Sequence, residues 1–223
     1  MKRTSTRHSS HGGAGFWIRI VAIVAALTGL TLAASAARAE TSADDALQGI
    51  NEYFNGIDTM RGQFVQIGPD GSRTEGQFAL KRPGLVRFHY NPPAQMDIIS
   101  DGTSVAVRDR KRASQDIWPL KRTPLRFLLS DQIDLTQDAK VSRVEVRPDV
   151  VLVTIAENTA FGDGTLTLMF DRGTDELKQW EVVDAQGQRT QVSIHNVALD
   201  TPVDPDLFKI DYTVIREGVN NRR

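Results

Sequence analysis

The chain has 223 residues, 27 basic and 28 acidic side chains, a formal charge of −1, and no cysteine. The absence of cysteine excludes disulfide frameworks and cysteine-ligated zinc sites, so the fold must be stable through its hydrophobic core. The length suits one domain with a substantial core.

Residues 1–39 have the character of a cleavable secretory leader. Basic side chains without acidic ones surround the start of an apolar run at residues 20–34, and residues 37–39 read Ala-Arg-Ala, a small-x-small cleavage pattern. The apolar run is shorter than the roughly 20 residues that a membrane-spanning helix needs. An uncleaved N-terminal anchor is the alternative. We therefore expect a signal peptide at 1–39 and a single exported domain at 40–223.

The predicted domain is acidic. Five basic and no acidic residues fall in the leader, which leaves 22 basic against 28 acidic residues, a formal charge of −6. This balance favours solubility and argues against nucleic acid or an anionic membrane as the main partner. Without cysteine the domain has no N-terminal cysteine to acylate. We expect the domain outside the cytoplasm, in the periplasm if the cell has two membranes.

The domain begins with an amphipathic helix, predicted over residues 44–60. Leu47, Ile50 and Phe54 recur at spacings of three and four, which places them on one face of a helix. Gly56 weakens the last turn, so the helix could end before residue 57.

Short strand-like runs follow, separated by turn signals, at residues 63–67, 77–81, 85–90, 97–100 and 105–108. The second and third meet at Arg82-Pro83-Gly84, where Pro fixes φ and Gly accepts a positive φ, as in a type II turn. Arg82 is therefore expected at the end of a hairpin.

Residues 85–90 alternate in polarity. Val86, Phe88 and Tyr90 share one face of the predicted strand, with Arg87 and His89 on the other. This predicts an apolar, partly aromatic sheet face beside Arg82.

A second, shorter helix is predicted over residues 123–131, with Thr123 as N-cap and Pro124 at the first helical position. Its apolar stripe consists of Leu125, Leu128 and Leu129. A helix of about two turns is stable only when it packs on something.

Further strands are predicted at residues 141–147, 150–156, 165–170, 176–183 and 190–197, and a last one at 207–211. Ten or eleven hairpin-linked strands with two short helices predict a mainly β fold, a large antiparallel sheet curved into a barrel or half-barrel. The helices either cover an apolar cavity as a lid or pack on a filled core, and the pattern alone leaves both open.

Several motifs, in order across nearly the whole predicted domain, resemble the LolA family of periplasmic carriers of outer-membrane lipoproteins. They are MRGQF at 60–64, GQF at 76–78, KRPG at 81–84, RFHYNPP at 87–93, ISDG at 99–102, PLKRTPL at 119–125 and VDPDLF at 203–208. Residues 138–188 match in strand pattern only.

The resemblance implies an unclosed antiparallel barrel whose helical lid covers an apolar cavity for acyl chains. Arg82 matches the arginine that bonds the barrel to the lid, Val86, Phe88 and Tyr90 match the cavity wall, and the two helices match the lid. The implied partners are acylated lipoproteins, an inner-membrane ABC-type transporter and an outer-membrane receptor. A monomer is expected, with no cofactor, metal or catalytic residue.

Three other classes of protein compete with a carrier. An enzyme lacks parts, because the domain holds only two histidines and no G-x-S-x-G elbow. Its carboxylate pairs, such as Asp97/Asp101 and Asp204/Asp206, sit beside turn signals, where Asp is expected anyway. A periplasmic lipid- or lipoprotein-sensing regulatory protein could use the same half-barrel. A scaffold could add a partner strand at an exposed sheet edge.

Overall fold

The computed structural model describes residues 43–137, 140–159 and 162–213. The leader predicted at residues 1–39 lies outside them. The described residues form one compact unit. Among the described residues, no helix combines the length and apolar character that crossing a membrane requires.

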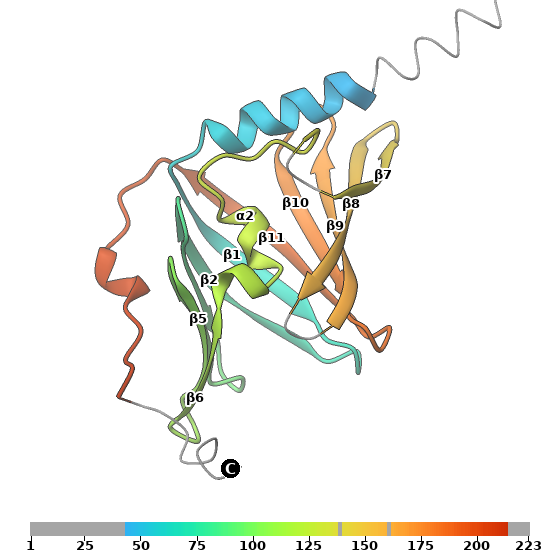
Figure 1. The fold of residues 1–223 in the computed structure, drawn as a ribbon. Coiled ribbons are helices and arrows are strands. Elements are labelled where there is room, and N and C mark those ends of the chain that lie inside the picture. Colours follow the sequence, from blue (N-terminus) through green and yellow to red (C-terminus); the bar gives the residue numbers. More distant parts are fainter. Residues whose placement is uncertain (1–42, 138–139, 160–161, 214–223) are drawn as a thin grey trace, which may run out of the picture. The chain divides into compact units, whose positions relative to one another are not determined.

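The unit is built on one antiparallel sheet of eleven strands (Figure 1). The strands are β1 (Thr59–Ile67), β2 (Arg73–Lys81), β3 (Leu85–Tyr90), β4 (Met96–Asp101), β5 (Ser104–Asp109), β6 (Ser114–Pro119), β7 (Val141–Val146), β8 (Val150–Thr159), β9 (Gly162–Asp171), β10 (Leu177–Val183) and β11 (Arg189–Leu199). Their order in the sheet is β6-β5-β4-β3-β2-β1-β11-β10-β9-β8-β7. β6 and β7 are edges, so the sheet is curved but not closed, and the predicted fold class is confirmed.

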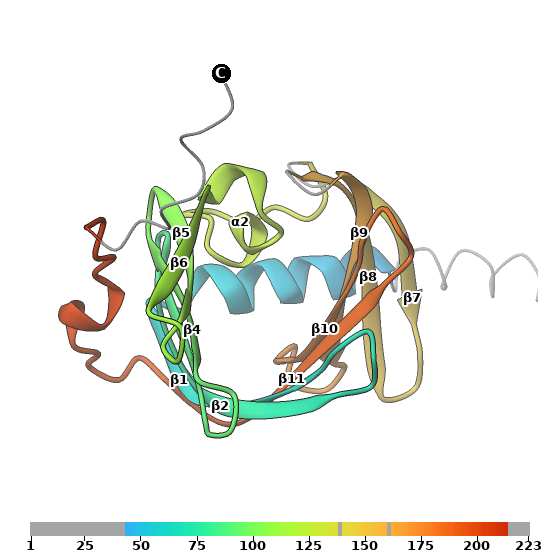
Figure 2. The same cartoon turned by 90° about the horizontal axis from the view of Figure 1, so that it is seen from below.

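Side chains alternate between the two faces of the sheet, and the apolar ones gather on the concave face, where they form the core. Phe64, Phe78 and Phe88 lie on one face of three neighbouring strands and are at most 6 % exposed. The sheet wraps this face around the helices (Figure 2). Burial of apolar side chains at about 25 cal/mol per Å² is what holds the helices inside the curve.

The helix predicted over 44–60 ends before residue 57, the earlier of the two ends that the sequence allowed. The described helix covers residues 43–55, and β1 already begins at Thr59. The Gly56 amide donates to the Glu52 carbonyl oxygen at 2.9 Å, which closes the last turn. Gly is a poor helix former, and the chain turns here into the sheet.

The second helix is shorter than predicted, and its cap is different. The region contains a 3₁₀ turn, η1 (Leu120–Arg122), and a single α-turn, α2 (Leu125–Leu128). Pro124 is the N-cap of α2, without a side-chain cap bond, and Thr123 donates its hydroxyl to the Leu120 carbonyl oxygen at 2.9 Å. Thr123 thus closes η1 and does not cap α2.

Two expectations about strands were wrong. β6 was not predicted, because only Ile117 and Trp118 in it are apolar and it lies at a sheet edge. The strand predicted at 207–211 is absent, and the 3₁₀ helix η2 (Pro205–Phe208) occupies its start. The Asp204 carboxylate accepts a hydrogen bond from the Asp206 amide at 2.9 Å and caps this helix.

The hairpin between β2 and β3 forms where it was predicted. Gly84 has a φ of +83°, and a Cβ there would lie 2.6 Å from the Gly102 Cα. Glycine is therefore required by both conformation and space. The Arg82–Pro83 peptide bond is cis, which the sequence did not predict.

Candidate ligand cavity and its helical cover

Two stretches of chain lie inside the curved sheet (Figure 2). One is the N-terminal helix of residues 43–55. The other, here termed the lid segment, is residues 120–135, which contain η1 and α2. Together they cover the apolar face on which the predicted cavity residues lie.

The Arg82 guanidinium joins the β2–β3 hairpin to both stretches. Its Nε lies 2.9 Å from the Ser130 carbonyl oxygen, and its Nη2 lies 2.6 Å from the same oxygen and 3.0 Å from the Asp131 carbonyl oxygen. Its Nη1 donates to the Phe54 carbonyl oxygen in the last turn of the N-terminal helix. The five donors of a guanidinium fork suit such a multiple contact.

The environment of Arg82 is half-buried. Burial lowers the pKa of its guanidinium from the ordinary value, while the carboxylates of Asp131 and Asp58 act in the opposite direction. An arginine remains protonated in proteins, so its contacts with the cover are charge-assisted and roughly twice as strong as neutral ones.

Backbone contacts of the same hairpin add to those of the side chain. The Arg82 amide donates to the Asp58 carbonyl oxygen at 2.8 Å, and the Gly84 amide donates to the Leu129 carbonyl oxygen at 2.9 Å. Ser100 donates its buried hydroxyl to the Gly84 carbonyl oxygen at 2.7 Å. These hydrogen bonds hold the backbone of the hairpin in place, and with it the position of the Arg82 Cα.

Two asparagines that sequence reasoning missed bond the N-terminal helix to the lid segment. Asn55 donates to the Ile133 carbonyl oxygen at 2.8 Å and accepts from the Ile133 amide at 2.9 Å. Asn51 accepts from the Leu135 amide at 3.0 Å. The spacing of four places both on one helix face, but nothing local in the sequence reveals partners about 80 residues away.

An apolar cavity of about 160 Å³ lies between the lid segment and the sheet. Its wall is almost entirely apolar and is formed by Phe64, Gln66, Phe88, Tyr90, Ile98, Pro124, Leu125, Leu128, Leu166, Trp180, Val182, Thr190 and Val192. A second cavity, of about 20 Å³, is lined by Phe54, Met60, Phe78, Leu80, Val86, Phe88, Leu125, Leu128, Leu129, Leu177, Trp180 and Ile194. Both lie under α2.

The predicted wall residues lie at these cavities. Val86, Phe88 and Tyr90 are at most 6 % exposed; Phe88 lines both cavities, Tyr90 the larger and Val86 the smaller. Aromatic rings fill the space around Phe88, with Phe64 at 5.2 Å and Trp180 at 6.0 Å between ring centres. Trp180 was not predicted as a wall residue, because its strand shows little alternation.

The predicted lid residues divide into two groups. Leu125 and Leu128 line both cavities, and Leu129 and Phe54 line the smaller one. Leu47 and Ile50 are buried in the core but line neither cavity. The N-terminal helix therefore packs mainly as core, and the lid segment forms the cover over the larger cavity.

One polar pair lies at the wall of the larger cavity. Tyr90 donates its hydroxyl to the Gln66 side-chain oxygen at 2.7 Å, and burial raises the pKa of Tyr90 above its ordinary value. Tyr90 therefore stays protonated at every physiological pH and acts here as a donor.

The closed interior is small. Typical sites for small molecules enclose roughly 300–1,000 Å³, and a dry cavity of about 150 Å³ holds a molecule the size of benzene. An apolar ligand much larger than benzene would therefore have to take the space that α2 and its leucines now occupy.

The carboxylate pairs considered for an enzyme have other partners. Asp97 is buried beside three basic side chains, Asp101 accepts amide hydrogen bonds in a turn, and Asp204 caps η2. Within residues 43–137, 140–159 and 162–213, His, Asp and Glu side chains do not gather in threes as a metal site requires. These carboxylates serve the fold.

Comparison with known proteins gives the family. The model of the outer membrane lipoprotein carrier protein LolA matches residues 55–211. The chain belongs to the LolA family. An outer-membrane lipoprotein carrier protein of Pseudomonas aeruginosa is 31% identical over 193 residues, which are 82% of this chain and 90% of that protein. One from Pseudomonas fluorescens is 28% identical over 205 residues, 87% of this chain and 94% of that protein.

A solved LolA superfamily protein from Nitrosomonas europaea is 12% identical, covers 76% of this chain and 98% of its own, and has a TM-score of 0.45. All of the LolA motifs quoted above, together with Arg82 and the lid segment, lie inside residues 55–211, which the family model matches.

Proposed function

We propose that this protein is a periplasmic carrier that takes the acyl chains of lipoproteins released from the inner membrane and delivers them to the outer membrane. The observation that supports this most directly is Arg82, which bonds both parts of the helical cover over an apolar interior. Membership of the LolA family points the same way.

A carrier is needed because of the size of the acyl anchor. A triacylated cysteine has on the order of forty methylenes, and each costs about 0.8 kcal/mol in water. Free diffusion of such an anchor across an aqueous compartment is negligible. An apolar protein interior lowers this cost for the duration of the transfer.

Release follows from competition between ligand and cover. In the closed form Leu125, Leu128 and Leu129 fill the space that an acyl chain would take, and Arg82 holds them there. Binding must break these contacts. The free energy gained by burying the acyl chain is therefore offset by the free energy lost when the leucines and Arg82 leave, and the net affinity stays moderate. Closure of the lid segment then favours departure of the ligand into an acceptor.

In this function the chain acts as a monomer, exported with residues 1–39 as its leader and working as the domain 40–223. It receives lipoproteins from an ABC-type transporter of the inner membrane and passes them to an outer-membrane receptor. Catalysis has no part in it, since each step is binding or release.

Loading can be measured with Trp180 as the reporter. Trp118→Phe leaves Trp180 as the single tryptophan of residues 40–223. A triacylated peptide with brominated chains should quench its emission, because a bound chain contacts the wall that Trp180 helps to form. The same peptide without acyl chains is the control, and equal emission with both peptides would contradict the proposal.

Arg82→Leu tests transfer in the same assay. It should still load, but move the peptide to acceptor vesicles about tenfold more slowly, since loss of charge-assisted bonds worth roughly 1.5–3 kcal/mol destabilises the closed, empty form. Arg73→Leu, an exposed arginine of β2 paired with Glu75, is the matched control. Transfer at the rate of the unaltered protein would refute the role of Arg82.

A further inference from the structure

The outer face of the sheet carries a second hollow, away from the apolar interior. A groove of about 930 Å³ crosses β11, β1, β2 and β3 and is walled by residues 202–204 and Leu207. Its functional groups come from Arg61, Gln63, Gln77, Arg87, His89 and Asn196. We term it the outer groove.

Strand register builds the floor of the outer groove. One cross-strand row runs His195–Gln63–Gln77–His89, and the next runs Ala198–Arg61–Ala79–Arg87. Phe64, Phe78 and Phe88 point inward, so by alternation these rows point outward. The two alanines leave open space on either side of Arg61.

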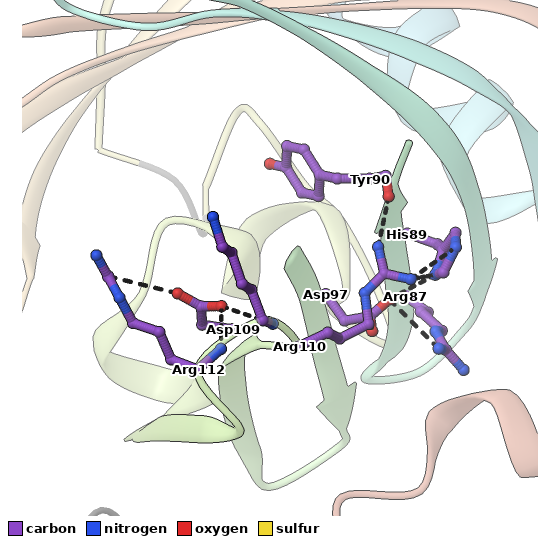
Figure 3. Close-up of polar contacts among 8 residues, drawn as sticks. Arg87, His89, Tyr90, Asp97, Asp109, Arg110 and Arg112 are labelled. Atoms are coloured by element: carbon purple, nitrogen blue, oxygen red, sulfur yellow. Dashed lines mark hydrogen bonds and ion pairs between the residues drawn. The ribbon is translucent and has the colours of Figure 1, made fainter. Parts of the chain in front are cut away.

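Arg87 and His89 are held in place by a buried carboxylate. Asp97 is 2 % exposed and lies 3.3 Å from Arg87 Nη2, 2.7 Å from His89 Nδ1 and 3.4 Å from Arg110 Nε (Figure 3). Arg110 Nη1 is also 3.1 Å from His89 Nε2. Arg87 is still 27 % exposed and His89 41 %.

The acidic groups around the outer groove are already engaged, and Asp97 also engages Arg87 and His89. The side chains of Arg61 and Gln77, by contrast, bond to no described residue. Asp97 has three basic neighbours, Asp204 caps η2, and Asp206 pairs with Lys209 at 2.7 Å. Arg61 is exposed, and its side chain bonds to nothing in the described part of the chain. The outer groove thus presents the charge of Arg61, unpaired among the described residues, on a domain whose formal charge is −6.

We propose that the outer groove binds a short, extended, acidic segment of a partner protein. Three strand spacings of about 4.8 Å give the groove a length of about 14 Å, which fits roughly four residues of extended chain. Arg61 and Arg87 match carboxylates two strands apart. The Gln77 amide, unbonded to any described residue, can both donate to and accept from a peptide backbone.

The amides favour a peptide over a phosphate. The Gln63 side-chain oxygen already accepts from the Asn196 side-chain amide at 2.9 Å. A phosphate or lipid headgroup has acceptors only and would leave the Gln77 side-chain oxygen without a donor, whereas a peptide backbone supplies both donors and acceptors. The outer groove also lies on the opposite sheet face from the apolar interior. Docking there leaves the interior free, so a partner can hold the protein whether it is loaded or empty.

The probe is a fluorescein-labelled octapeptide of alternating Glu and Ser, tested on the intact exported protein by fluorescence anisotropy at low salt. His89 and His195 are the only histidines of residues 40–223, and both lie in one row of this face, so their imidazole NMR signals report the site directly. Arg61→Gln removes a cation whose side chain has no hydrogen bond or ion pair with a described residue. Arg73→Gln removes an equal charge on the same face outside the groove.

We expect the octapeptide to shift the His89 NMR signals. Arg61→Gln should weaken the affinity for the octapeptide about tenfold, and Arg73→Gln should leave it within about twofold. The affinity of the unaltered protein should fall as the salt concentration rises. The same octapeptide with Gln in place of Glu should not bind. Equal weakening by both variants, or equal binding of both peptides, would overturn the proposal. Binding only to vesicles of anionic phospholipid, lost in Arg61→Gln, would overturn it in favour of a membrane surface.

Discussion

The N-terminal helix and the lid segment cover the same apolar face but are held there by different means. The helix runs over residues 43–55 and buries Ile50 completely and Phe54 to 4 % exposure. The lid segment has one α-turn of four residues, and its place depends on bonds to Arg82, Asn51 and Asn55. A single turn has no stability of its own. The lid segment also buries Leu128, Leu129 and Leu135 to at most 5 % exposure, so both stretches contribute to the core. For the proposed carrier function, we expect the lid segment to move away from the sheet and the helix to stay.

The largest expected difference is in unfolding. Ile50→Ala should lower the free energy of unfolding by about 2–5 kcal/mol, because it opens a cavity in a packed core. Leu125→Ala should cost about 1 kcal/mol, since Leu125 is half-buried and already borders a cavity. Urea denaturation measures both. Equal losses would remove the distinction between the helix and the lid segment.

Local opening sharpens the comparison. Arg82→Leu should speed hydrogen exchange of the Gly84 and Ile133 amides about tenfold, because each lost charge-assisted bond is worth roughly 1.5–3 kcal/mol. Amides of the N-terminal helix should change less. Arg73→Leu serves as the control and should alter neither set. Uniform acceleration through both elements would mean that Arg82 stabilises the whole fold.

The smallest expected effect is a loss of local stability at the end of the lid segment when the pH is lowered. Hydrogen bonds from Thr136, first from its hydroxyl and then from its amide, hold the pKa of Asp134 below its usual value. A depressed folded pKa contributes stability above the unfolded value of about 3.9 that is lost as pH falls through the folded one. NMR titration of the Asp134 carboxyl should show this. After correction for intrinsic exchange rates, the lid end near Leu135 should then show a lower protection factor at pH about 3 than at pH 6, an effect absent in Asp134→Asn.

Much of the fold was readable from local pattern. Alternation located ten strands, and Pro83-Gly84 located the hairpin that presents Arg82. β6 was not predicted because a strand at a sheet edge needs no apolar face. The strand prediction at residues 207–211 was wrong because Asp204 and Pro205 start a 3₁₀ helix where apolar residues suggest a strand.

The side-chain contacts of the site were harder to predict from the sequence than the strands were. Arg82 could be placed through the family resemblance, but Asn51, Asn55 and Trp180 act through partners far along the chain. The pairing of His89 with Asp97 and Arg110 likewise appears only once β3, β4 and the end of β5 lie side by side. Sequence pattern reports burial and period, and long-range pairing depends on the assembled sheet.

The sheet order leaves β6 and β7 each with one neighbour. In a closed barrel the number of strands and their stagger set a fixed circumference, and the interior can grow only if ladder hydrogen bonds break. A sheet with two free edges has no such circumference. Small changes in twist, shared among ten strand pairs, can widen it while every ladder stays paired. For the carrier function proposed above, we therefore expect the sheet to widen or narrow with the bulk of the bound acyl chains.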